Sequence, residues 1–376
     1  MAGRRVVLGT LLPPGARAAA AAVEPPLAEL RRLAESAGAQ PAAELIQHRQ
    51  TPTGSHYFGV GKVGELKALL RRERATAVLV DDELSPVQGR NLEKELGCTV
   101  LDRTELILDI FASWARTRQA RVQVELAGLE YFLPRLRRRW THLERQTGGI
   151  GVRGGAGERQ IELDRRAIRD RITDCRREIR AIGEQRRRLV ASRAGFAVSL
   201  VGYTNAGKST LMRALTGADV YVADRLFATL DTRTREMKLG GGLSALLSDT
   251  VGFIRRLPHH LVASFSATLE ETRRADLILH VVDLSSPAYP AEMETVRAVL
   301  ADLGVAATPV LVALNKVDLV SEPSAVRRAT ADVPGAVAIS ALRGAGLDQL
   351  RALIVERMFE GAEEAELLLA PAGGQS

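Results

Sequence analysis

The sequence predicts an α/β protein with several domains. Two stretches alternate short apolar runs with amphipathic segments, as α/β domains do, and the stretch between them has the heptad spacing of paired helices. A length of 376 residues also exceeds what one hydrophobic core usually supports. We expect an N-terminal α/β domain at 1–117, an antiparallel helical hairpin at 118–195, a doubly wound, mainly parallel α/β domain at 196–360, and a flexible tail at 361–376.

The first domain is predicted from the order of its segments. Strands are expected at 6–12, 77–81 and 99–101, and helices at 27–37, 63–73 and 86–96. Strands separated by helices indicate a small α/β domain.

Two runs of apolar residues at steps of three and four predict the hairpin. The first run is Val122, Leu126, Leu129, Leu133, Leu136, Trp140 and Leu143, and the second is Ile161, Ile168, Ile172, Cys175, Ile179, Ile182 and Leu189. Pro134 lies inside the first run and should kink it. Residues 148–157 contain too many glycines for a helix, so we expect them to form the tip of the hairpin.

A phosphate-binding loop opens the third domain. Residues 202–209 match the pattern GxxxxGK[ST] directly after an expected buried strand at 198–201 and before an expected helix at 210–215, which is the context that this motif needs. Backbone N–H groups of the loop can hold phosphates, Lys208 can reach the β- and γ-phosphates, and the Ser209 hydroxyl can bind Mg²⁺. The loop therefore predicts binding of a nucleoside triphosphate with magnesium.

Two residues after the expected strand at 245–248 extend this site. Asp249 can hold the magnesium ion through water, and Gly252 leaves room for its N–H to approach the γ-phosphate. Alone, this segment is an ordinary strand-to-turn sequence, but its position downstream of the loop favours the metal role.

The segment 315–318 indicates guanine as the base. The Asp318 carboxylate can accept from both N1–H and the 2-amino group of guanine, two donors that adenine does not present together. Residues 340–342 are placed to offer a backbone N–H to guanine O6. Each segment is a weak signal alone, but their order along the chain predicts a GTPase.

A second magnesium ligand is expected between the loop and Asp249. Thr229, Thr232 and Thr234 compete for this role, and we favour Thr229, although spacing leaves the choice open. Phe253 follows Gly252, where many regulatory GTPases carry a glutamine that orients the attacking water. Because a phenyl ring cannot do so, we expect slow intrinsic hydrolysis that a partner stimulates. Packing of Phe253 against the switch is the alternative.

Composition narrows the setting of this activity. The net charge of +7 suits a polyanionic partner such as nucleic acid. The alternative is that this charge only keeps the protein soluble. Cys98 and Cys175 are far apart and lack CxxC spacing, so neither a disulfide framework nor a zinc site is indicated. No stretch approaches the roughly 20 apolar residues of a membrane span. We expect a cytoplasmic protein that is monomeric when free and has no stable membrane insertion.

Over nearly its whole length the chain resembles the HflX family of translational GTPases. The segments that carry this resemblance are DDELSP at 81–86, RNLEK at 90–94, DRT at 102–104, LILDIF at 106–111, WTHL at 140–143, GGIG at 148–151, GYTNAGKST at 202–210 and FATLD at 227–231. The resemblance implies a cytoplasmic GTPase that binds the large ribosomal subunit and splits stalled or idle ribosomes, particularly under stress. It also implies that Ser209 and Thr229 bind magnesium, and that the hairpin reaches toward the peptidyl-transferase centre. Where the family loop reads GPGET, residues 155–159 read GAGER, which makes the tip more positive.

Together these arguments give a set of expected site residues. The catalytic residues are Lys208, Thr229 and Gly252, and the magnesium ligands are Ser209 and Thr229, with Asp249 acting through water. The residues expected to bind GTP or GDP are Gly202, Tyr203, Thr204, Asn205, Ala206, Gly207, Lys208, Ser209, Thr210, Phe227, Ala228, Thr229, Leu230, Asp231, Asp249, Thr250, Val251, Gly252, Asn315, Lys316, Val317, Asp318, Ser340, Ala341 and Leu342. Potassium (K⁺) is a further expected cofactor, with Asn205 as its ligand. The alternative is that Asn205 only hydrogen-bonds the loop backbone.

The hairpin is dense in arginine, which suits phosphate contacts and base stacking in ribosomal RNA. The residues expected to bind RNA are Gly148, Gly149, Gly151, Arg153, Gly154, Gly155, Gly157 and Arg159. Arg135 belongs to the same arginine-dense stretch. Solvated helix flanks are the alternative explanation of these charges. The alternative function is that of a ribosome assembly factor or RNA-binding GTPase switch without splitting activity.

Overall fold

The computed structural model describes residues 1–15, 24–136, 158–191, 195–217, 226–227, 233–256, 271–305 and 307–369, with the backbone alone at 158–161, 185–191 and 361–369. The chain groups into two compact units. The N-terminal unit lies within Met1–Arg187, and the C-terminal unit lies within Arg188–Arg256 and Ser266–Ser376.

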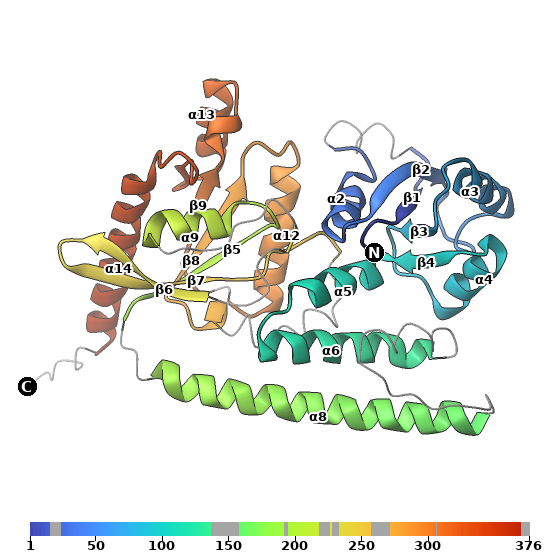
Figure 1. The fold of residues 1–376 in the computed structure, drawn as a ribbon. Helices are drawn as coiled ribbons and strands as arrows, with labels where there is room; N and C mark the ends of the chain where they lie inside the picture. Colours follow the sequence, from blue (N-terminus) through green and yellow to red (C-terminus); the bar gives the residue numbers. More distant parts are fainter. Residues whose placement is uncertain are drawn as a thin grey trace, which may run out of the picture. The chain divides into compact units, whose positions relative to one another are not determined.

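The N-terminal unit contains a four-stranded parallel sheet with the order β2-β1-β3-β4 (Figure 1). Its strands are β1 (Arg5–Leu12), β2 (Gln40–His48), β3 (Ala77–Val80) and β4 (Thr99–Asp102). Its helices are α2 (Ala28–Ser36), α3 (Val60–Arg72), α4 (Pro86–Leu96) and α5 (Arg103–Trp114). Buried residues of α3 and α4 share one core cluster with the sheet, while α2 and α5 pack against each other. The predicted α/β character is confirmed.

Two elements of this unit were not predicted from the sequence. Strand β2 is an edge strand with mostly half-exposed positions, so it lacks the continuous apolar run of a central strand. Helix α5 is buried on almost all sides, so its apolar residues show no single helical face.

Helices α6 (Arg118–Phe132) and α8 (Glu158–Ala191) form the described part of the hairpin. Their heptad positions pack into one cluster made of Val122, Leu126, Leu129, Ile172 and Cys175. Ion pairs from Arg118 to Glu178 and from Arg171 to Glu125 show that the two helices run in opposite directions. The irregularity expected at Pro134 is confirmed, because α6 gives way there to the short 3₁₀ helix η1 (Leu133–Arg135). The glycine-rich tip lies outside the described residues.

The C-terminal unit contains a six-stranded sheet with the order β10-β9-β8-β5-β7-β6. Its strands are β5 (Ala197–Gly202), β6 (Arg233–Gly240), β7 (Leu243–Asp249), β8 (Leu277–Asp283), β9 (Val310–Asn315) and β10 (Val337–Ala338). Only β6 is antiparallel among these described strands, so the expectation of a mainly parallel sheet is confirmed. Because parallel strands place their carboxyl ends at one edge, the residues that follow β5, β7, β8 and β9 come together.

Helices cover both faces of this sheet (Figure 1). They are α9 (Lys208–Thr216), α12 (Tyr289–Asp302), α13 (Pro323–Asp332) and α14 (Leu347–Leu369), with the short helix η2 (Val317–Leu319) after β9. Helices α9 and α14 share one core cluster with the sheet, and α12 and α13 share another. Helix α14 continues to Leu369, beyond the boundary that we expected at 360. Among the described residues, no helix has the length and apolarity needed to cross a membrane.

Candidate active site

The loop between β5 and α9 fits against its neighbours because of two glycines. Gly202 has a φ of +154°, and a Cβ there would lie 2.2 Å from the Val281 carbonyl oxygen. Gly207 has a φ of +95°, and a Cβ there would lie 2.3 Å from Asn315 Nδ2. A side chain at either position would push the loop away from β8 or β9. The loop leads directly into α9, whose first backbone N–H groups have no partner within the helix and attract anions.

Lys208 is the first residue of α9, and its ammonium group is buried at the centre of the loop. Nζ donates to the carbonyl oxygens of Gly202 at 3.0 Å and Tyr203 at 2.9 Å. Burial lowers the pKa of Lys208 to about 8, and the nearby Asp249 carboxylate opposes that shift. A bound phosphate would add further negative charge and favour the protonated form. The arrangement therefore holds a cation where the loop and the helix N-terminus converge.

Ser209 and Asp249 meet beside this cation. The Ser209 hydroxyl donates to Asp249 Oδ2 at 2.7 Å, and Asp249 is fully buried at the carboxyl end of β7. A hydroxyl and a carboxylate are hard oxygen donors of the kind that Mg²⁺ binds, together with substrate phosphates. The donor set of these two residues thus fits magnesium.

The segment after β7 is joined to the phosphate-binding loop by its backbone. Thr204 N–H donates to the Phe253 carbonyl oxygen at 2.7 Å, and Phe253 N–H donates to the Gly202 carbonyl oxygen at 3.1 Å. The Thr250 hydroxyl also donates to the Leu200 carbonyl oxygen at 2.6 Å. These bonds bring Gly252 against the loop, where a Cβ would lie 3.0 Å from Lys208 Nζ.

Asn315 ties three parts of the predicted guanine site together. Its Nδ2 donates to the Ala206 carbonyl oxygen at 2.8 Å, and its Oδ1 accepts from Ala341 N–H at 2.9 Å. The asparagine is buried at the end of β9. It therefore fixes the segment at 340–342 relative to the phosphate-binding loop.

Asp318 lies in η2 with its carboxylate exposed, next to these fixed segments. Leu319, at the end of η2, and Leu342 are also exposed, at 61% and 67%. The structure thus brings the residues at 315–318 and 340–342 into one place.

Asp283 is a polar residue of this region that sequence reasoning missed. It ends β8 and accepts at Oδ2 from Lys316 Nζ at 2.6 Å, and the lysine has a left-handed backbone conformation with φ of +65°. Ser285 holds the other carboxylate oxygen through its N–H at 3.0 Å and its hydroxyl at 2.6 Å. The available signal was a carboxylate at the carboxyl end of a strand that is otherwise apolar except for His280.

Several predicted site residues lie outside the described part of the chain. They are Ala228, Thr229, Leu230 and Asp231 of the switch, and Gly148, Gly149, Gly151, Arg153, Gly154, Gly155 and Gly157 of the tip. Phe227 is buried with a φ of +61°, and Arg159 lies in α8. Of the three candidate threonines, Thr234 lies in β6 with its hydroxyl 3.0 Å from that of Ser248, and the other two lie outside the described residues, so the choice stays a prediction.

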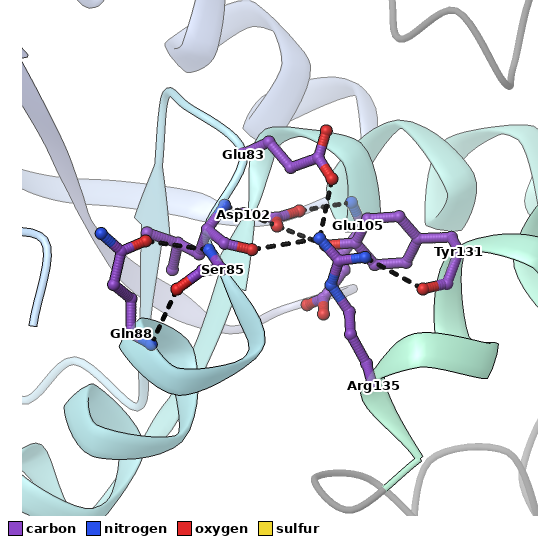
Figure 2. Close-up of polar contacts among 8 residues, drawn as sticks. Glu83, Ser85, Gln88, Asp102, Glu105, Tyr131 and Arg135 are labelled. Atoms are coloured by element: carbon purple, nitrogen blue, oxygen red, sulfur yellow. Dashed lines mark hydrogen bonds and ion pairs between the residues drawn. The ribbon is translucent and has the colours of Figure 1, made fainter. Parts of the chain in front are cut away.

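The place of Arg135 in the arginine-dense stretch suggested that it lies on an open helix flank, but the structure shows that it does not. It is 8% exposed, and its guanidinium donates to Glu83 Oε1 at 2.7 Å and to the carbonyl oxygens of Leu84 at 3.1 Å and Tyr131 at 3.0 Å (Figure 2). It also stacks 3.7 Å from the centroid of the Tyr131 ring. The Tyr131 hydroxyl donates in turn to the buried Asp102. Arg135 is therefore committed to contacts inside the N-terminal unit.

Comparison with known proteins accounts for both units. Three family models match: one described as GTP-binding GTPase N-terminal at residues 24–112, one as GTP-binding GTPase Middle Region at 114–193, and one as 50S ribosome-binding GTPase at 197–316. The protein described as GTPase HflX from Chlamydia pneumoniae is 46% identical over 345 residues, which cover 90% of this chain and 73% of the relative. The GTPase HflX of Escherichia coli (strain K12) is 44% identical over 354 residues, which cover 93% and 83%.

The chain belongs to the HflX family of GTPases. The resemblance found in the sequence is confirmed, and this HflX-family chain is an enzyme that hydrolyses GTP. A solved structure described as the crystal structure of SsGBP and GDP complex matches with a TM-score of 0.50 at 24% identity. The match covers 96% of this chain and 99% of the SsGBP chain, and it supports the assignment of the fold.

Proposed function

We propose that this chain binds GTP with Mg²⁺ at the phosphate-binding loop and uses its hydrolysis to bind the large ribosomal subunit and split stalled or idle ribosomes. The observation that carries the nucleotide part is the buried ammonium group of Lys208 beside the Ser209 and Asp249 pair. The observation that carries the ribosome part is the match to the family described as 50S ribosome-binding GTPase.

In this proposal each group of the loop has one task. Lys208 Nζ and the N–H groups at the start of α9 bind and orient the β- and γ-phosphates. Ser209 and Thr229 would hold magnesium directly and Asp249 would hold it through water. When bound, the ion would supply positive charge beside the phosphates. Gly252 N–H would donate to the γ-phosphate. Asp318 reads the guanine while Asn315 keeps the base-contacting segments in place.

We further propose slow hydrolysis by the free protein and faster hydrolysis on the ribosome. Phe253 is 3% exposed and its side chain has no group that could orient water. The catalytic set within the chain therefore lacks a water-orienting side chain at this position, and a ribosomal partner would complete the geometry.

We assign the binding of ribosomal RNA to the hairpin. In this proposal the chain divides into domains at 1–117, 118–195 and 196–360, and the hairpin is the second of them. On α8 the described side chains of Arg166, Arg169 and Arg180 are exposed. Exposed arginines along one helix suit the phosphates of a folded RNA. The glycines at 148–157 would let the tip approach RNA closely. The protein would act in the cytoplasm and would be monomeric when it is free of the ribosome.

Light scattering of intact ribosomes tests the splitting activity. The wild type should lower the scattering in a GTP-dependent manner, and a variant in which a short neutral turn replaces residues 148–157 should bind GTP normally without splitting. Sedimentation with a non-hydrolysable GTP analogue separates the alternative function. Co-sedimentation with ribosomes that stay intact would favour an assembly or RNA-binding switch, and splitting at the normal rate by the tipless variant would refute the role of the tip.

A further inference from the structure

The phenol of Tyr203 joins the phosphate-binding loop to the segment that follows Gly252. We call residues 252–256 the switch segment. Arg255 N–H donates to Tyr203 Oη at 2.8 Å, and the tyrosine is only 6% exposed. The hydroxyl is thus a fixed acceptor for a backbone group of the switch segment.

This contact extends the backbone pairing between the same two segments. Tyr203 and Phe253 form a parallel β-bridge, in which Phe253 N–H and its carbonyl oxygen both bond to the loop. Phe253 and Ile254 are buried, at 3% and 1% exposure. The bridge holds the start of the switch segment, and the phenol holds it two residues further on.

The result is that Gly252 is fixed beside the cation of the loop. A Cβ on Gly252 would lie 2.8 Å from Thr204 Cα and 3.0 Å from Lys208 Nζ, so the backbone here is already in close contact with the loop. In the proposed site, Lys208 is the group that reaches the γ-phosphate. The Gly252 N–H is therefore held near the place where the γ-phosphate must sit.

We propose that Tyr203 is a positioning residue for GTP recognition: its hydroxyl holds the switch segment so that Gly252 N–H is ready for the γ-phosphate. This inference rests on the proposed phosphate site at Lys208. GDP lacks the γ-phosphate, so its binding does not depend on Gly252. Loss of the hydroxyl should weaken binding of GTP and leave binding of GDP unchanged.

Tyr203→Phe tests this, since it removes the hydroxyl and keeps the ring. Affinities for GDP and for a non-hydrolysable GTP analogue are measured by competition with a fluorescent nucleotide. We expect the analogue to bind about two- to tenfold more weakly, the value of one neutral hydrogen bond, with GDP affinity within about twofold of wild type. In steady-state hydrolysis KM should rise by the same factor while kcat changes little. Tyr289→Phe at the start of α12 is the matched control and should change neither affinity.

Amide hydrogen exchange of the peptide that contains Arg255 provides an independent readout. Exchange should be faster in Tyr203→Phe than in the wild type, because the amide loses its acceptor. Equal weakening of GDP and analogue, or unchanged exchange and affinities, would overturn the role of Tyr203. A wild type that binds neither nucleotide would instead contradict the proposed phosphate site.

Discussion

Arg103 lies in a buried charge cluster that should decide the stability of the N-terminal unit. Its side chain is 4% exposed and pairs with Glu29 Oε1 at 3.0 Å and with Asp81 Oδ1 at 2.7 Å. The two carboxylates are 7% and 14% exposed. Arg103→Met keeps much of the side-chain volume but leaves two buried carboxylates without this cation.

The size of the effect follows from this burial. Removing one partner from a buried ion pair destabilises a protein by about 3–5 kcal/mol. With a urea dependence of about 1–3 kcal/mol per molar, this shifts the unfolding midpoint by about 1–5 M. Arg31→Met is the matched control in the same unit, because Arg31 pairs with Glu44 while 41% exposed. Such exposed pairs contribute about 0–1 kcal/mol.

The chain offers a separate probe for each unit. The sequence has two tryptophans, Trp114 and Trp140, and both precede Arg187, so tryptophan fluorescence reports on the N-terminal unit. Binding of a fluorescent GDP reports on the C-terminal unit. Arg103→Met should lower the urea midpoint of the unfolding transition that tryptophan fluorescence follows, and it should leave GDP binding in buffer unchanged. A shift no larger than that of Arg31→Met would refute the reasoning.

The destabilisation should also depend on pH. Burial raises the pKa of Asp81 above its usual value of 3.8, and the Arg103 charge opposes this shift. Removing the arginine therefore raises this pKa further. A carboxyl group whose pKa is raised in the folded state favours folding below its unfolded pKa, and this contribution is lost as the pH rises through the folded pKa. The difference in unfolding free energy between Arg103→Met and wild type should shrink as the pH falls toward 4 and grow toward neutrality. An Asp81→Asn change added to Arg103→Met should recover part of the loss at neutral pH.

Three predictions concern the nucleotide site. Gly252→Ala should weaken binding of a GTP analogue about tenfold or more and binding of GDP much less. The added methyl group overpacks the γ-phosphate side of the site, which costs about 1–3 kcal/mol. Equal losses for both nucleotides in competition binding would contradict this. Asp318→Asn should shift preference from GTP toward xanthosine triphosphate by about ten- to a hundredfold, since the amide can donate to the 2-oxo group, and an unchanged preference would remove Asp318 from base reading. Potassium should accelerate hydrolysis more than sodium at equal ionic strength, and Asn205→Ala should abolish the difference; equal wild-type rates would end this proposal.

The phosphate-binding loop could be predicted from the sequence because its constraints are local. A glycine at 207 and a lysine and serine directly after it are dictated by one tight turn into one helix, whatever surrounds them. The alternation of elements was equally accessible. Contacts between distant segments were not, because no local pattern marks them. Lys316 meets Asp283 from the neighbouring strand, and Tyr203 meets Arg255 only once β5 and β7 are paired.

The arginine content of the hairpin did not reveal that Arg135 is buried. A run of basic residues on a helix carries the same compositional signal whether its side chains face RNA, solvent or a buried carboxylate. Arg135 sits over Tyr131 and binds Glu83, from the loop after β3, 52 positions away in the chain (Figure 2). Burial raises the pKa of Tyr131, and the charge of Asp102 adds to this, so the phenol stays protonated as a donor.

This distinction changes where the RNA-binding proposal should be tested. Arg135 and Arg103 are buried in the N-terminal unit, so removing either would lower stability and would reduce ribosome binding for a reason unrelated to RNA. Arg166, Arg169 and Arg180 are exposed on α8, and replacing them with glutamine keeps helix propensity while removing charge. If the hairpin binds ribosomal RNA, that triple variant should bind ribosomes more weakly, and its affinity should depend less steeply on salt. If the charges only solvate the helix, ribosome affinity and its salt dependence should match those of the wild type.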